Sequence, residues 1–362
     1  SLILKKPRLV FLALILITSF FFINTKDFRL DASSETLLIE GDPDLKYLKE
    51  INQRYKSKDF LVLTFTPKEA LISESSINNI LSLKYKIQSL DWVHSVVTIL
   101  DVPLLESSDE PLMDRIKNFR TLKDENIDKE RAFNEILNSP VFKNLVISED
   151  ATTTGIIVNL KRKKILEASA FDNEKVFEDY KDKLKSENHK NIKEIREVID
   201  SFKNIGKIHL GGIPMIADDM MSFIKKDIIV FGIGVLAFII ITLWFVFRKV
   251  LWIAIPISSC FFAVIIMIGF LGLMNWKVTV ISSNFIAMML ILTMAMNIHI
   301  STRYIQLAKT YPDLNNYEVL KIATSKMVWP ILYTVLTTIC AFLSLIFSGI
   351  KPIIDFGWMM TF

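Results

Sequence analysis

Apolar residues are distributed unevenly along the 362-residue chain. They form one run from Arg8 to Asn24 and four runs after Asp227, whereas the residues between are charged like those of a globular domain. The four later runs extend over residues 228–247, 251–274, 278–300 and 327–347. At about 1.5 Å per residue, about 20 residues cross a hydrocarbon core of about 30 Å. The pattern predicts a polytopic α-helical membrane protein, in which Pro352 to Phe362 opens a sixth helix and the sequence is a fragment.

The first run, RLVFLALILITSFFFIN, follows Lys5 and Lys6 and fits either a signal peptide or a retained membrane helix. A signal peptide ends in a small-x-small cleavage site, but this chain continues as NTKDFRLD. The sequence therefore favours a retained helix over residues 1–26. Because the run is near the lower limit of length for a span, we expect it to be partly buried against other helices.

Basic residues beside the membrane runs predict the orientation, because Lys and Arg are retained on the cytoplasmic side. The expected cytoplasmic set is Lys5, Lys6, Arg8, Arg248 and Lys249, with Arg303, Lys309, Lys321 and Lys326 in the loop after the fourth helix. The opposite short loops carry Lys277 and Lys351. We therefore expect a multi-pass protein of the bacterial inner membrane, with a cytoplasmic N-terminus and with residues 27–226 in the periplasm.

The segment 27–226 has a mixed α and β pattern. Residues 59–66 (DFLVLTFT) predict a buried strand, residues 76–90 a helix and residues 93–100 a second strand. The same order recurs as a strand over 152–161, a helix over 174–202 and a short strand over 208–210. The pattern predicts two similar α/β units in series with their helices on one side of a sheet, or else one ordinary α+β domain.

A turn and a helix are predicted where this segment meets the second membrane run. Gly211, Gly212 and Pro214 favour a turn. The amphipathic residues 215–226 then favour a helix that continues directly into the membrane run. A rigid connection of this kind could couple a shift of the membrane helix to the outer domain.

Composition excludes several classes of function. The hydrophobic content of 51% is high for a soluble protein, and the net charge of +4 comes from dispersed residues, which gives no support to a nucleic-acid partner. Cys260 and Cys340 both lie in apolar runs, so no disulfide framework is expected outside the membrane. The four histidines are scattered, and no GxxxxGK, HExxH or nucleophile-elbow motif occurs. We therefore expect no metal, no cofactor and no enzyme activity.

Layout and local strings together resemble a known superfamily. The strings are DASSETLLIEGDPDLKYLKEI (31–51), HLGGIPMIADDM (209–220) and IKPIIDFGWMM (350–360). With one helix, an α/β domain and five helices, the chain resembles the N-terminal repeat of the RND (resistance-nodulation-division) superfamily, in its MMPL-like branch of hydrophobe/amphiphile exporters. The resemblance implies a membrane helix (1–26), an inserted periplasmic porter-like α/β domain (27–226) and a bundle like the sterol-sensing domain (227–362). It also implies twelve helices in two repeats and export driven by the proton gradient.

The fourth membrane helix departs from the pattern of that superfamily. Its members have a Gly-rich run with one or two Asp, followed by Ile-His and then Arg-Tyr. This chain reads ILTMAMNIHISTRY (291–304), so Ile298-His299 and Arg303-Tyr304 match. The acid positions are occupied by Ala295 and Met296, neither of which can carry a proton.

Other polar residues inside the membrane runs are candidates for coupling or for a transport path, because such groups are costly in lipid. They are Thr293, Asn297, His299, Tyr333, Thr337 and Asp355. Each has a structural alternative. His299 and Asp355 could be interfacial, Asp355 near the N-terminal dipole of its helix, and the others could serve as interhelical hydrogen-bonding groups.

Three functions stay open at this point. The first is an exporter of lipids or other hydrophobic or amphiphilic molecules, whose partners would be its substrate, the membrane and a second copy or periplasmic protein. The second is a non-transporting membrane sensor or partner protein, which the loss of the acids favours. The third is a protein-export accessory subunit, whose expected strings are absent.

Overall fold

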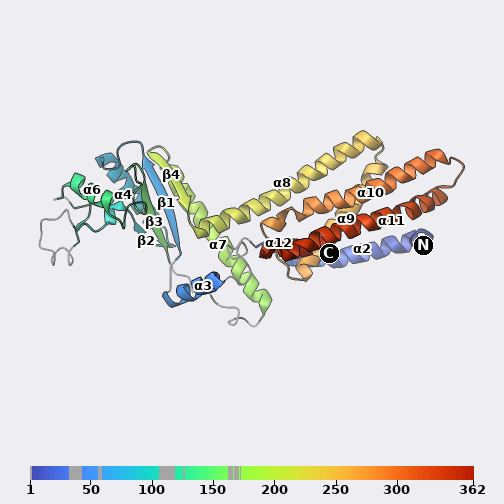
Figure 1. Cartoon of the computed structure of the whole chain (residues 1–362), viewed down its shortest axis with the longest axis horizontal. Helices are drawn as coiled ribbons and strands as arrows, with labels where there is room; N and C mark the ends of the chain where they lie inside the picture. Colours follow the sequence, from blue (N-terminus) through green and yellow to red (C-terminus); the bar gives the residue numbers. More distant parts are fainter. Residues whose placement is uncertain are drawn as a thin grey trace. The chain divides into compact units, whose positions relative to one another are not determined.

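The computed structural model describes residues 2–31, 43–55, 59–105, 119–124, 127–161, 166, 171 and 173–362 (Figure 1). The chain forms two compact units. We call Tyr47–Asp219 the sheet unit, and Ser1–Lys46 together with Met220–Phe362 the helical unit. Residues 32–42 of the string 31–51 lie outside the described residues.

One four-stranded sheet organises the sheet unit. Its strands are β1 (Phe60–Pro67), β2 (Val93–Val97), β3 (Thr154–Leu160) and β4 (Gly206–Gly211), and all neighbours are antiparallel in the order β2-β3-β1-β4. Helix α4 (Glu74–Gln88) connects β1 to β2, and α7 (Glu174–Ser201) connects β3 to β4. Each connection passes over a strand of the other unit, as in the split βαβ arrangement. The two predicted α/β units are therefore interleaved in one sheet rather than placed in series.

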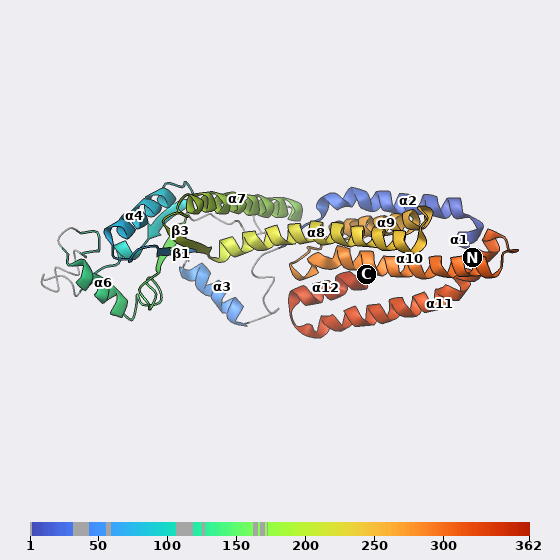
Figure 2. The same ribbon diagram turned by 90° about the horizontal axis from the view of Figure 1, so that it is seen from above.

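The core of the sheet unit lies between the sheet and both of these helices. Leu61, Leu63 and Phe65 alternate along β1 and are fully buried, which is the pattern of a strand with one covered face. The helices contribute buried residues at helical spacing: Ile80, Leu83 and Ile87 from α4, and Ile192, Ile195 and Ile199 from α7. Figure 2 shows α4 and α7 on the same side of the sheet. The described residues of this unit also form α3 (Pro43–Tyr55), which begins in the helical unit, the 3-10 helix η3 (Ile99–Asp101) and α6 (Lys129–Asn138).

The helical unit contains the apolar helices. Its elements are α1 (Leu2–Lys5), α2 (Pro7–Asn24), η1 (Thr25–Asp27), most of α8 (Ile213–Phe247), α9 (Leu251–Leu273), η5 (Ile281–Asn284), α10 (Phe285–Thr310), α11 (Asn316–Leu343), η6 (Ser344–Ser348) and α12 (Lys351–Thr361). Among the described residues, five helices are long and apolar enough to cross a membrane. The amphipathic residues 215–226 and the second membrane run form the single helix α8, as the sequence predicts.

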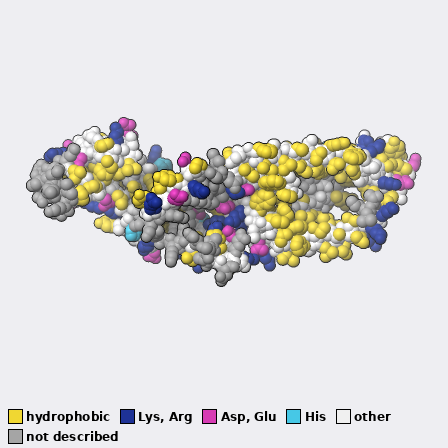
Figure 3. All heavy atoms as spheres, turned by 60° about the horizontal axis from the view of Figure 1, so that its bottom comes forward, with side chains coloured by type: hydrophobic (Ala, Val, Ile, Leu, Met, Phe, Trp, Pro, Cys, Tyr) yellow, Lys and Arg dark blue, Asp and Glu magenta, His cyan; other side chains and the backbone are white. Residues whose placement is uncertain are grey.

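The outer surface of these helices is apolar. Figure 3 shows hydrophobic side chains spread over the face of the helical unit that it presents. Phe238 and Phe245 of α8, for example, are 70% and 76% exposed. Each Å² of apolar surface left in water costs about 25 cal/mol, so this surface requires an apolar medium. The protein is therefore a multi-pass membrane protein.

Helices α10 and α11 extend further than predicted. Arg303 and Lys309 lie inside α10, and Lys321 and Lys326 lie inside α11, so these four residues are not in a loop. The connection is residues 311–315, and Asn315 with Glu318 forms a capping box that begins α11. The physical reason is that a helix continues past the hydrocarbon boundary, where water solvates its charged side chains. The hydropathy of the sequence identifies only the apolar part of such a helix and not its ends.

The chain before α10 forms a separate 3-10 turn, η5, within the run where a fourth helix was predicted from residue 278. The Ser282 hydroxyl accepts a hydrogen bond from the Thr279 amide at 2.8 Å, and both residues are buried. Just before this turn, the Asp31 amide donates to the Val278 carbonyl at 2.8 Å, and the Val278 amide donates to the Arg29 carbonyl at 3.0 Å. The residues after α2 are thus joined to those before α10.

Helices α2 and α9 approach each other very closely at two glycines. A Cβ atom added to Gly269 would lie 2.0 Å from the Phe21 carbonyl oxygen, and one added to Gly272 would lie 2.2 Å from that of Asn24. No Cβ can occupy either place unless the two backbones separate. Small residues at such positions allow membrane helices to pack at short range. The first helix therefore packs on α9 along one face, while most of its side chains remain exposed and Thr18 is buried.

Replacement of Gly269 by alanine should destabilise the protein, because the new methyl group would meet a backbone carbonyl that cannot rotate away. We expect the free energy of unfolding to fall by about 1–3 kcal/mol, the usual cost of overpacking. Thermal unfolding of the purified protein in detergent measures this loss. The control is Gly234→Ala in α8, where an added Cβ meets nothing within 4 Å. Equal melting temperatures for the two variants would contradict the close packing of α2 on α9.

Candidate functional site

The polar candidates of α10 lie on two different sides of the helix, with Thr293 and Asn297 on one and His299 on another. Thr293 and Asn297 are half-buried, and the Asn297 Nδ2 group donates to the Thr293 carbonyl oxygen at 2.9 Å, one turn earlier in the same helix. His299 and Ala295 are exposed, whereas Leu290 and Met294 are buried against α9. The side of α10 that carries Ala295 and His299 is therefore turned away from the packed core of this unit.

The polar stripe of α11 also points away from the packed helices. Tyr333 is 60% exposed, and the Thr337 hydroxyl donates to the Thr334 carbonyl at 2.9 Å. Thr334 in turn donates to the carbonyl of Pro330 at 2.9 Å. Within residues 220–362, all of which are described, no hydrogen bond joins Tyr333 or Thr337 to the candidate residues of α10. In this part of the chain the two polar sets are therefore not linked by a hydrogen bond.

Asp355 lies in the first half of the short helix α12. Its carboxylate is 3.8 Å from the Lys351 ammonium group, one turn earlier, and the Asp355 side chain is about one-fifth exposed. Helix α12 packs closely on α11, because a Cβ at Gly357 would lie 2.7 Å from the Phe342 carbonyl oxygen. Asp355 is thus a charged group on a helix that is tightly joined to α11.

Tyr304, one of the residues that match the superfamily pattern, joins α10 to the ends of three other helices. The Tyr304 hydroxyl donates to the Asn316 side-chain oxygen at 3.2 Å, which connects α10 to the start of α11. The Tyr304 ring lies 5.4 Å from the ring of Trp252 in α9, which stacks on Phe247 of α8. Arg303 donates to Gln306 at 2.7 Å in the next turn. This part of the Ile-His and Arg-Tyr pattern is therefore a structural anchor between helices.

The described residues contain no group of three or more His, Cys, Asp or Glu side chains that could hold a metal ion. Cys260, one of the two cysteines, is buried between α9 and α10, where its Sγ atom lies 3.8 Å from the Leu290 carbonyl oxygen. It behaves there as a small core residue.

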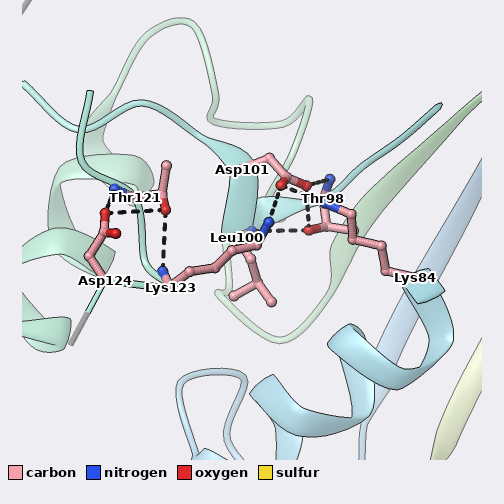
Figure 4. Close-up of polar contacts among 7 residues, drawn as sticks. All are labelled: Lys84, Thr98, Leu100, Asp101, Thr121, Lys123 and Asp124. Carbon is pink, nitrogen blue, oxygen red and sulfur yellow. Dashed lines mark hydrogen bonds and ion pairs between the residues drawn. The ribbon is translucent and has the colours of Figure 1, made fainter. Parts of the chain in front are cut away.

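A polar cluster in the sheet unit holds the segment 119–124 against the end of β2 (Figure 4). Asp101 accepts a hydrogen bond from the Lys84 ammonium group at 2.6 Å and another from that of Lys123. The Thr98 amide and hydroxyl also donate to Asp101, at 2.8 and 2.9 Å, and this capping box ends the predicted strand at Val97 in a 3-10 turn. Burial alone would raise the pKa of Asp101, but these hydrogen bonds lower it to about 2. The cluster joins α4, the end of β2 and the segment 119–124, and so stabilises the fold.

Comparison with known proteins identifies one family. The sequence pattern of the MMPL family matches residues 179–359, half of the 362-residue chain. The match begins in α7, includes β4 and α8 to α11, and ends within α12. A search of curated proteins finds no match.

The Asp101 cluster should make stability depend on pH in the acid range. Because the pKa of the folded protein, about 2, lies below the ordinary value of 3.8, the contribution is complete above about pH 4 and is lost as the pH falls toward 2. We expect Asp101→Asn to cost about 1–2 kcal/mol at pH 7, after allowance for partial exposure, and nothing near pH 2. Urea unfolding from pH 7 to pH 2 measures this difference. Asp91→Asn, in an exposed turn, is the control, and a deficit that persists unchanged at pH 2 would contradict the assignment.

Proposed function

The chain belongs to the MMPL family, and from this premise we propose that it is an RND-type secondary exporter of lipids or other hydrophobic or amphiphilic molecules. The observation that carries the proposal is the family match, which extends over α8 to α12, including four of the five candidate membrane spans. Members of this family are transporters rather than enzymes. Transporters built in this way work by rocking of helix groups, and the sheet unit would take up or hand on the substrate.

We place the protein in the bacterial inner membrane with its N-terminus in the cytoplasm. The start of α2, the α8–α9 turn and the α10–α11 turn lie at the same end of the helical unit (Figures 1 and 2). Lys5, Lys6 and Arg8 lie at or just before the start of α2, Arg248 and Lys249 lie in the α8–α9 turn, and Lys309 lies in the last turn of α10. A concentration of Lys and Arg at one end supports a cytoplasmic location for it. Residues 27–226 would then be periplasmic and would form the porter-like domain.

Energy coupling to the proton gradient is part of the proposal, but Ala295 and Met296 cannot supply it. The remaining candidates on this chain are Thr293, Asn297, His299, Tyr333, Thr337 and Asp355, of which Asp355 is the one carboxylate. A path for water or for a polar group of the substrate would be lined by the uncharged candidates Thr293, Asn297, Tyr333 and Thr337. The acids that take up and release protons would have to lie elsewhere in the working transporter.

The second candidate function is a non-transporting membrane sensor with a sterol-sensing-like bundle. The specific observation in its favour is again Ala295 with Met296 at the positions expected to carry acids. A sensor would bind a hydrophobic molecule without moving it, so it would need no change of charge inside the membrane. Measurement of transport therefore separates the two functions directly.

Cells that produce the full-length protein should expel a hydrophobic fluorescent dye such as Nile red faster than cells with an empty vector. An exporter lowers the steady-state dye content, and a protonophore should remove the difference because it collapses the driving gradient. Time-resolved fluorescence of preloaded cells measures the rate. Equal rates with and without the protein, at verified membrane levels, would reject export of this probe class and favour the sensor.

His299→Ala should leave this efflux within about twofold of the wild-type rate. His299 is exposed, and within residues 220–362 its ring makes no hydrogen bond, so its removal disturbs neither packing nor a built relay. Initial efflux rates, normalised to the amount of protein in the membrane, provide the comparison. Loss of efflux at a normal protein level would show that coupling does pass through His299.

A further inference from the structure

Three polar contacts join α7 to the first turns of α8, all of them within the sheet unit. The Asn188 side-chain amide donates to the Pro214 carbonyl at 2.8 Å. His189 Nδ1 lies 2.8 Å from an oxygen of Asp218. Arg196 donates to the two oxygens of Asp219 at 2.7 and 2.8 Å. We call these six residues the α7–α8 clamp.

Burial makes the Asp218 contact the most specific part of the clamp. Its side chain is 7% exposed, whereas that of His189 is 60% exposed. A carboxylate removed from water needs a hydrogen-bonding partner, and here the partner comes from the other helix. Arg196 and Asp219 are 45% and 27% exposed. Because water screens exposed charges, this ion pair stabilises the fold less than the buried Asp218 contact does, but its two hydrogen bonds orient α8 against α7. The α8 helix is therefore held at Asp218 and aligned at Asp219.

The turn before α8 is fixed on its other side as well. Gly212 has a φ of +123°, a conformation that disfavours any side chain, and a Cβ there would lie 2.9 Å from the Phe60 carbonyl oxygen. This glycine lets the chain leave β4 against β1 and begin α8 at once. The first turns of α8 are thus held between the sheet, through Gly212, and α7, through the clamp.

Helix α8 then continues without a break to Phe247. Its residues 213–219 belong to the sheet unit, and the rest belongs to the helical unit. Backbone hydrogen bonds in every turn make a helix stiff along its axis. An axial shift or rotation of the membrane part of α8 must therefore either carry α7 along or break the clamp.

We propose that the α7–α8 clamp is a positioning device that makes α7, and with it the strands β3 and β4 that α7 connects, follow the movement of α8. The inference rests on the proposed transport function. In an exporter, the clamp makes the sheet unit, which would handle the substrate, change its conformation together with the membrane helices. Its residues position α8 and need not touch the substrate.

Charge reversal tests the clamp in the full-length protein. In Asp219→Arg, two like charges replace the ion pair with Arg196, and in the double variant Arg196→Asp, Asp219→Arg the pair is restored in the opposite sense. We expect the single variant to exchange the amide hydrogens of residues 213–222 about tenfold faster and to expel Nile red several-fold more slowly. The double variant should recover both properties. Asp200→Arg is the control, since Asp200 pairs with Lys203, 2.8 Å away and outside α8.

The possible results distinguish a failure of the clamp proposal from a failure of the proposed transport function. Faster exchange with unchanged efflux in the single variant would overturn the clamp's role in transport and leave it a stabilising contact. A double variant that recovers neither property would overturn the pairing itself. An absence of efflux from the wild type would reject the proposed function and the clamp's role together. Asp218→Asn, which keeps the shape but removes the charge, should also slow efflux if the variant reaches the membrane at a normal level.

Discussion

The close approach of α2 and α9 at Gly269 and Gly272 is the contact on which the helical unit depends. In lipid, helices gain no hydrophobic free energy by associating, because the acyl chains are as apolar as the side chains. Association then requires van der Waals contact at short range. The two glycines provide it, since their Cα atoms lie against the Phe21 and Asn24 carbonyls. The pairing of Asp31 with Val278 continues this join from the end of α2 to the chain that leads into α10.

Helix α8 is held differently. It packs on α9 and α10 through Ile239 and Leu243, and a Cβ at Gly232 or Gly234 would meet nothing closer than 4.0 Å. Contacts made by side-chain tips can be exchanged for others at a small cost, whereas the backbone contact at Gly269 cannot. The strongest polar contacts of α8 are at its start, in the clamp. The membrane part of α8 thus lacks a backbone contact of the kind that joins α2 to α9, whereas its first turns are hydrogen-bonded to α7.

Sequence reasoning predicted what is set by local pattern. The membrane runs, the strands β1 and β3 and the helix α7 all have the periodicity or length that defines them. Strand order was not predictable, because alternation in β1 shows which side chains face the core but not which strand lies beside it. The helix ends around Arg303 and Lys321 were missed because hydropathy falls where a helix enters water, even though the helix continues.

In the candidate site, too, local features could be predicted from the sequence but the arrangement of the helices could not. The polar residues of α10 and α11 are visible in the sequence, but their direction depends on the rotation of each helix, which places Tyr333 and Thr337 on an exposed side. The partner of Asp218 lies 29 residues earlier in the chain, so a pair of acids before a membrane run gave no sign of a contact with α7.

Hydrogen bonding inside α10 and α11 constrains how energy could be coupled. Asn297 and Thr337 donate to carbonyls of their own helices, which satisfies these donors without a second helix. These side chains therefore do not force α10 and α11 together, and a change in helix contact leaves their hydrogen bonds intact. A proton relay, by contrast, needs groups that change charge, and residues 285–298 contain no Asp, Glu, His, Lys, Arg, Tyr or Cys. The first half of α10 therefore carries no side chain that could take up or release a proton.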